Sequence, residues 1–126
     1  MKTVNKNLTN NEIYSYALAL MNDFPESDAY MPAAVAYSIQ KNKTAVVGLG
    51  EEIEKSRLSI IQHYELDKLQ DGDEVDPAII EKANAELMDL LNIEQEVKIY
   101  TFDIEALNDV KLTSAQMQAI MFMIED

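Results

Sequence analysis

A long helix-forming segment, from Pro32 to about Glu65, limits the folds that this chain can adopt. Pro32 suits the first turn of a helix, where a missing backbone N–H costs no intrahelical hydrogen bond. At a rise of about 1.5 Å per residue, a helix over this segment would be about 50 Å long. A compact domain of this chain length is only about 36 Å across. The helix therefore either bends or extends beyond its own domain.

Two glycines, Gly48 and Gly50, lie inside this segment. Each costs about 1 kcal/mol relative to alanine in a helix interior, so their positions mark a kink, a break or a close contact. If the helix does not bend there, a second subunit would cover the part that overhangs the domain. We expect a homo-oligomer, at least a dimer.

Shorter elements are predicted before the long helix. Residues 1–8 form an edge strand or an N-terminal arm, and Thr9 and Asn10 cap a first helix. The pair Phe24 and Pro25 ends that helix. Its apolar side comprises Ile13, Tyr14, Ala17, Leu18 and Met21.

Further elements follow an acidic polar loop, DKLQDGDEVDP. A third helix spans residues 76–92, and residues 97–104 are the best strand candidate because they are rich in β-branched and aromatic side chains. Thr113 and Gln116 resemble a capping box for a last helix. The apolar faces of these two helices comprise Ile80, Ala83, Leu87, Leu90 and Leu91, and Met117, Ile120, Met121 and Ile124. The predicted fold is a single α+β domain over residues 1–126, mostly helical, with one long central helix and a small antiparallel sheet.

Charge and composition exclude several classes of function. The net charge is -13, which disfavours binding to nucleic acid or to a membrane surface. The absence of cysteine excludes disulfides and thiolate catalysis. The N-terminus lacks the apolar region of a signal peptide, and no apolar run is long enough to span a membrane. We therefore expect a soluble protein of the cytoplasm.

Acidic residues are unevenly distributed along the chain, which leaves one stretch of sequence suited to binding an anion. Residues 29–50 contain no Asp or Glu, yet they include Lys41 and Lys43, and the only arginine, Arg57, follows shortly. Lys41, Asn42 and Lys43 lie near Tyr37 in sequence. These lysines are interpreted either as a solvated helix face or as ligands for an anion, and Tyr37 and Tyr64 either as half-buried core residues or as stacking partners for a base.

Arg57 is the most informative single residue of the long segment. On a helical grid it shares a face with Ile53, Ile60, Ile61 and Tyr64, so its charge must find an acceptor. One interpretation is a structural ion pair, with Glu54 one turn away or with an acid of the third helix. The other is a phosphate or carboxylate ligand held in a pocket.

Motifs for catalysis or for metal binding are not recognised in the sequence. His63 is the only histidine and has no second metal ligand at a suitable spacing, so no zinc site is predicted. GLGEE lacks the third glycine of a dinucleotide fingerprint, and DGDEVD lacks the spacing of a calcium loop. We expect no enzymatic activity, no cofactor and no metal.

The order of these segments resembles small acidic bacteriophage proteins of unknown function. The resemblance covers most of the chain and rests on YSIQKNK, IEKSRLSIIQHY, ELMDLLNIEQEV and LTSAQMQAIMFMIED. A narrower resemblance is to the phage anti-Thoeris sponges, through the basic-bearing long helix followed by an E-L-x-x-L-L-N element. Those proteins form oligomers and sequester cyclic ADP-ribose signals of the host's defence. The resemblance implies that Arg57 and Asn92 contact the ligand. It also implies that the protein acts in the cytoplasm of an infected bacterium.

Three functions follow as hypotheses. In the first, the protein sequesters a small anionic nucleotide without hydrolysing it, with Arg57 and a lysine holding phosphate, a tyrosine stacking on the base and Asn92 reading a polar edge. In the second, its acidic half inhibits a basic host protein, such as a defence protein or a nucleic-acid-binding protein. The third is a virion or assembly component.

Overall fold

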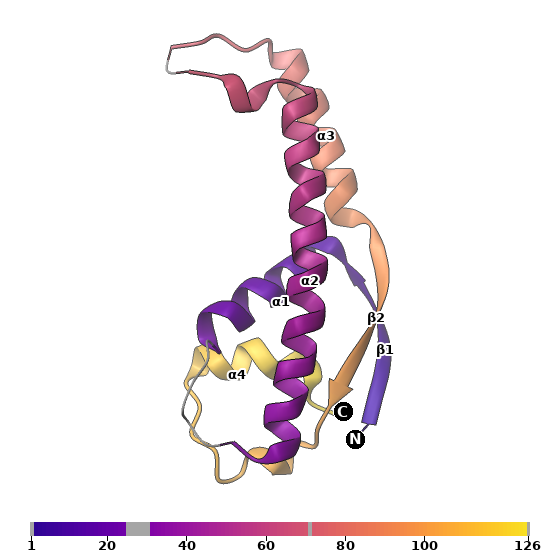
Figure 1. Cartoon of the computed structure of the whole chain (residues 1–126), viewed down its shortest axis with the longest axis vertical. Helices are drawn as coiled ribbons and strands as arrows, with labels where there is room; N and C mark the ends of the chain where they lie inside the picture. The colour runs from indigo at the N-terminus through magenta and orange to yellow at the C-terminus, as the bar shows by residue number, and fades with distance from the viewer. Residues whose placement is uncertain (1, 25–30, 71, 126) are drawn as a thin grey trace.

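The computed structural model describes residues 2–24, 31–70 and 72–125; the predicted positions Met1 and Pro25, and Asp71 of the predicted acidic loop, lie outside them. The elements are β1 (Lys2–Thr9), α1 (Asn10–Asp23), α2 (Ala33–His63), α3 (Pro77–Asn92), β2 (Glu94–Thr101) and α4 (Ser114–Ile120), with short 3₁₀ helices at Leu66–Lys68, Ile104–Leu107 and Met121–Met123. This is the predicted α+β fold, mostly helical with a small antiparallel sheet (Figure 1).

The sheet pairs the first strand with the second. β1 is antiparallel to β2, with Thr9 opposite Glu94 and Lys2 opposite Thr101. β2 begins earlier than the predicted strand and ends before Ile104, which starts a 3₁₀ helix capped by Asp103. The reason is that pairing with β1 recruits polar residues whose intrinsic strand propensity is low, so tertiary context overrides propensity.

Local sequence signals fix the starts of three helices as predicted. Thr9 and Thr113 each form a complete capping box, with Glu12 and Gln116 respectively. Asp76 accepts a hydrogen bond from the backbone N–H of Ala78 at the start of α3. These caps satisfy backbone N–H groups that have no partner inside the helix.

The core lies where α1, α2 and α4 meet the inner face of the sheet (Figure 1). The predicted apolar side of α1 is only partly right, since Leu18 and Met21 are exposed and Leu20 is fully buried. Likewise Met121 is 61% exposed, because the chain changes from α to 3₁₀ helix there and turns Met123 into the core instead. The core residues with the least exposure are Ile13, Leu20, Val35, Val46, Ile99, Ile120 and Met123.

Helix α2 is continuous through both glycines (Figure 1). A Cβ atom on Gly50 would lie 3.4 Å from the Cβ of Ala17, whereas one on Gly48 would meet nothing within 4 Å. The sequence predicted a kink, a break or a close contact at these glycines. Gly50 marks a close contact with α1, and the helix is not broken at either position.

The C-terminal half of α2 projects away from the core and is accompanied by α3, which runs back alongside it (Figure 1). Residues 53–92 are called the arm below. The overhang was predicted, but the covering helix comes from the same chain, so the homo-oligomer stays a prediction. The arm is only two helices thick, and Ala83 is the one residue of α3, all of which is described, that is buried. No helix within the described residues is long and apolar enough to cross a membrane.

Candidate ligand-binding hollow

Asn42 fixes the edge of the sheet against α2. Its side chain is fully buried and donates from Nδ2 to the carbonyl oxygen of Tyr100 at 2.8 Å, while its Oδ1 accepts from the backbone N–H of Tyr100 at 2.8 Å. Nδ2 also lies 3.4 Å from the Sδ atom of Met123. The backbone N–H and C=O groups of Tyr100 are thus both satisfied by the Asn42 side chain, which sets the position of Tyr100 relative to α2.

Beside this contact, an open hollow of about 530 Å³ lies between α2 and β2. Its lining residues are Tyr37, Gln40, Lys41, Thr44, Ala45, Lys98 and Tyr100. The Tyr37 and Tyr100 rings are 6.0 Å apart between centroids and nearly perpendicular, at 81°. The Nζ atom of Lys41 lies 5.5 Å from the Tyr37 centroid and 6.0 Å from that of Tyr100, and Nζ of Lys98 lies 5.4 Å from the Tyr100 centroid.

The hollow is cationic within a strongly acidic protein. Its described lining contains two ammonium groups and no carboxylate. The strand register places Thr3 opposite Tyr100 and Asn5 opposite Lys98, and both of these β1 residues are exposed. Because directly opposed residues of an antiparallel pair point to the same face, uncharged polar side chains extend the surface beyond the hollow. The arrangement can hold an anion together with a planar group.

Lys43 has a different role from Lys41. Its Nζ atom donates to the backbone oxygen of Phe24 at 2.7 Å, where α1 ends. That carbonyl lies at a helix C-terminus, where a lysine satisfies an otherwise unpaired oxygen and complements the helix dipole. Lys43 therefore ties α1 to α2 and does not line the hollow.

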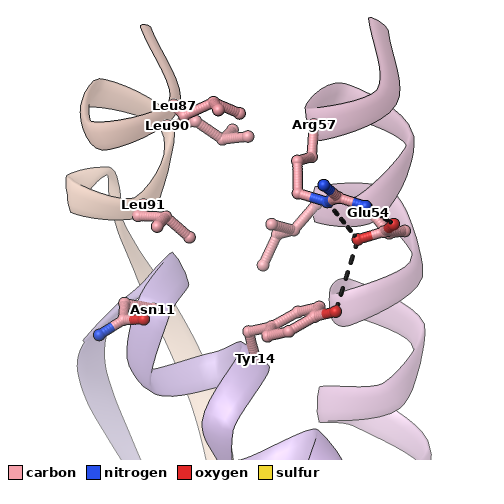
Figure 2. A pocket seen from close by; sticks show the side chains of 8 residues that line it. Asn11, Tyr14, Glu54, Arg57, Leu87, Leu90 and Leu91 are labelled. Carbon is pink, nitrogen blue, oxygen red and sulfur yellow. Dashed lines mark hydrogen bonds and ion pairs between the residues drawn. The ribbon is translucent and has the colours of Figure 1, made fainter. Parts of the chain in front are cut away.

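Arg57 forms the ion pair with Glu54 that was one of its two predicted roles. Its Nε donates to Oε2 at 2.9 Å and its Nη2 to Oε1 at 2.6 Å, and the Tyr14 hydroxyl reaches Oε2 at 3.5 Å (Figure 2). The hydrogen bond from Arg57 lowers the pKa of Glu54, and the same bond raises the pKa of Arg57. The Arg57 side chain is 43% exposed, so solvent screens this pair.

The pair forms one wall of a second, apolar cavity of about 280 Å³ between α1, α2 and α3 (Figure 2). We call it the apolar groove. Leu87, Leu90 and Leu91 of α3 face Arg57 across it, and Tyr14 closes its lower side (Figure 2). The full lining is Asn11, Tyr14, Ile53, Glu54, Arg57, Leu87, Leu90 and Leu91.

Two predicted ligand contacts lie outside both cavities. Tyr64 directly follows α2, and the Glu86 carboxylate of α3 raises the pKa of Tyr64. Asn92 is exposed at the end of α3. The six predicted residues are therefore not gathered into one site: Tyr37 and Lys41 share the hollow, Arg57 lines the groove, and Lys43, Tyr64 and Asn92 line neither.

Sequence reasoning missed Lys98 and Tyr100. They alternate with the buried Val97 and Ile99 along β2, a period that was visible and that assigns them to the outer face of the strand. The described residues contain no group of three or more His, Cys, Asp or Glu side chains that could hold a metal ion. In comparisons with protein-family models, curated proteins and solved structures, no match to this chain is found.

Proposed function

We propose that this chain is a non-catalytic binding protein that holds a small anionic nucleotide in the hollow between α2 and β2. The observation that carries the proposal is the convergence of Lys41 and Lys98 on the rings of Tyr37 and Tyr100. The ammonium groups would bind phosphate oxygens through charge-assisted hydrogen bonds, and an exposed tyrosine face would stack on the base. The lining described above offers no carboxylate or imidazole as a general base, which favours retention over turnover.

The class of ligand is taken from the sequence resemblance, although the two ligand contacts that the resemblance implies, Arg57 and Asn92, lie outside the hollow. A sponge for cyclic ADP-ribose or a related cyclic nucleotide would sequester an immune signal in the cytoplasm of an infected bacterium. A second subunit could close the open side of the hollow, in keeping with the expected homo-oligomer. Arg57 is not part of this binding set, because it lines the apolar groove instead.

The test is a thermal-shift screen of the purified protein against isomers of cyclic ADP-ribose and cyclic nucleotides. A ligand at a hundred times its Kd adds about 2.7 kcal/mol of stability, which is readily seen as a rise in Tm. We expect one compound to raise Tm, the shift to be lost in the Lys41→Ala/Lys98→Ala double variant, and the ligand to be recovered unmodified after heat release.

Lys55→Ala is the matched control, because Lys55 is an exposed lysine of the same helix outside the hollow. The proposal is wrong if no compound in the panel shifts Tm, or if the shift is as large in the double variant as in the unmodified protein. Recovery of a hydrolysed ligand would contradict its non-catalytic part.

A further inference from the structure

We infer that the backbone N–H and C=O groups of Lys98 bind the hydrogen-bonding edge of the nucleobase in the hollow between α2 and β2. This inference rests on the proposed function, because it names the feature of the nucleotide, besides phosphate, that the site recognises. Its basis is the pairing of successive positions along the edge of β2 that faces α2.

This edge of β2 is closed at two successive positions by the chain's own groups. At Phe102, which directly follows the strand, the backbone N–H donates to residues 123–125 at 3.2 Å and the carbonyl oxygen accepts from the same segment at 2.9 Å. At Tyr100 the side-chain amide of Asn42 takes both roles, at 2.8 Å each. Because every second residue of a strand directs its backbone groups to the same side, the next position on this edge is Lys98.

Lys98 has an open donor and an open acceptor at this edge. Like Tyr100, it belongs to the residues whose backbone groups point away from β1, because pairs in an antiparallel sheet alternate between bonded and non-bonded. Within the described part of the chain, no other group hydrogen-bonds to the N–H or C=O of Lys98. The α2 residue one turn after Asn42 that lines the hollow is Ala45, whose methyl group offers no hydrogen bond.

The side-chain amide of Asn42 shows which kind of group fits such a position. It is planar and carries an acceptor and a donor side by side, which match the C=O and N–H of one strand residue. A nucleobase has edges of the same kind: adenine, for example, carries the acceptor N7 beside its N6 amino donor. The amide or amidine edge of a base is therefore the class of group that complements Lys98.

An extended peptide added to β2 is the competing occupant, because an open strand edge also pairs with backbone. Two features favour a base. Asn42 closes the edge at Tyr100, so a peptide could not continue past that position. Two ammonium groups and two tyrosine rings meet around Lys98, whereas the next residues along this edge, Glu96 and Glu94, carry carboxylates and do not line the hollow. A planar base that carries phosphate fits this position.

The probes are adenosine 5′-monophosphate, its N6,N6-dimethyl derivative and ribose 5-phosphate, and the readout is an NMR titration of the ¹⁵N-labelled full chain. The dimethyl derivative keeps the phosphate and the ring but lacks the amino donor, and ribose 5-phosphate lacks the base. We expect adenosine 5′-monophosphate to bind at least about fivefold more tightly than either control, and to shift the Lys98 amide signal. Equal binding of all three would overturn the inference but leave an anion site in the hollow.

Lys98→Pro and Lys98→Ala separate the backbone donor from the ammonium group. Both variants lack the ammonium group, but only the proline variant lacks the N–H. Proline is compatible with this position because the N–H makes no bond to β1. We expect Lys98→Pro to bind adenosine 5′-monophosphate about fivefold more weakly than Lys98→Ala. Glu96→Pro removes the neighbouring N–H on the same edge, outside the hollow, and should bind like the unmodified chain. Equal affinities of the two Lys98 variants would overturn the inference.

Hydrogen exchange keeps the test decisive if Lys98→Pro does not fold, as judged by circular dichroism. Adenosine 5′-monophosphate should then slow exchange of the Lys98 amide in the unmodified chain, and the dimethyl derivative should not; equal rates would overturn the inference. Failure of both adenosine 5′-monophosphate and ribose 5-phosphate to bind would overturn the anion site as well. Slow exchange at Glu94, Glu96 and Lys98 in a nucleotide-free dimer would assign the edge to a second copy and overturn the inference.

Discussion

The side-chain amide of Asn42 exchanges two hydrogen bonds of 2.8 Å with the backbone of Tyr100, much as a neighbouring strand would. Because Asn42 is fully buried, no water can replace either bond without rearrangement. One side chain of α2 therefore sets both the edge of the sheet and the position of a tyrosine that lines the cationic hollow.

Replacing Asn42 with leucine should be strongly destabilising. The variant leaves the N–H and C=O groups of Tyr100 without their partner, and each buried group left unpaired costs about 1–3 kcal/mol. We expect a loss of about 2–4 kcal/mol in the free energy of unfolding, measured by urea denaturation. Ser56→Ala, an exposed position of the same helix, should change it by less than about 0.5 kcal/mol. A loss no larger than that of Ser56→Ala would mean that Asn42 does not hold the sheet edge.

The two glycines of α2 should respond differently to substitution. A Cβ atom at Gly48 meets nothing within 4 Å, so Gly48→Ala should raise the free energy of unfolding by about 0.5–1 kcal/mol through helix propensity alone. At Gly50 the methyl group of Ala17 lies at contact distance, so a leucine there should cost about 1–3 kcal/mol by overpacking. Thermal unfolding followed by circular dichroism measures both. Equal tolerance of leucine at the two positions would contradict the close contact between α1 and α2.

The ion pair between Glu54 and Arg57 should contribute stability only above acidic pH. The pKa of Glu54 is lowered in the folded state from its ordinary value of 4.5, so its contribution is present above that value and is lost as the pH falls through the folded-state pKa. Glu54→Gln should therefore be less stable than the unmodified chain near neutral pH, by about 0.5 kcal/mol for so exposed a pair.

The difference between Glu54→Gln and the unmodified chain should shrink as the pH falls below about 4. Urea denaturation at a series of pH values measures it, with Glu52→Gln as an exposed control on the same helix. A difference that grows toward acidic pH would have the wrong sign for this account.

Asn10 joins the arm to the rest of the molecule. Its Nδ2 donates to the carbonyl oxygen of Leu90 at 2.8 Å, its Oδ1 accepts from Nε2 of Gln95 at 2.7 Å, and its backbone N–H donates to the carbonyl oxygen of Ile93 at 2.8 Å. Asn10→Ala removes the two side-chain bonds, and we expect a loss of about 1–3 kcal/mol in the free energy of unfolding. Hydrogen exchange at the end of α3 should become faster, because the loss is local.

Ser15→Ala is the control for Asn10→Ala, since Ser15 is an exposed residue of the same helix that lines neither cavity. Exchange at the end of α3 that is equally fast in both variants would argue against Asn10 as the joint between α1 and the arm.

The starts of α1, α3 and α4 could be predicted because each is set by a capping side chain that acts on nearby backbone groups. Thr9, Asp76 and Thr113 are side chains that satisfy backbone N–H groups within three residues of themselves, so their effect does not depend on the rest of the fold. Burial was less predictable. Leu18 and Leu20 are equally apolar, and which of them is buried depends on where α2 and α4 approach α1.

For the same reason only two of the seven residues that line the candidate hollow could be predicted. Tyr37 and Lys41 are one turn apart on a helix, a relationship fixed by the helical period. Their association with Lys98 and Tyr100 depends on which backbone groups of β2 face Asn42, and a strand register is set by long-range pairing. Arg57 was predicted on an apolar helix face, and an arm of two helices leaves its side chain 43% exposed.

The pairing of β1 with β2 also has a consequence for how the chain reaches this structure. Thr9 lies opposite Glu94, so the first strand has no partner until nearly the whole sequence is present. Contacts between residues so distant in sequence form slowly, because the entropy of closing the intervening loop must be overcome first. The helical hairpin of α2 and α3 involves shorter separations. During synthesis the arm can therefore form ahead of the sheet, and the side of α1 that packs against α4 stays exposed to chaperones and to aggregation until the C-terminal helix emerges.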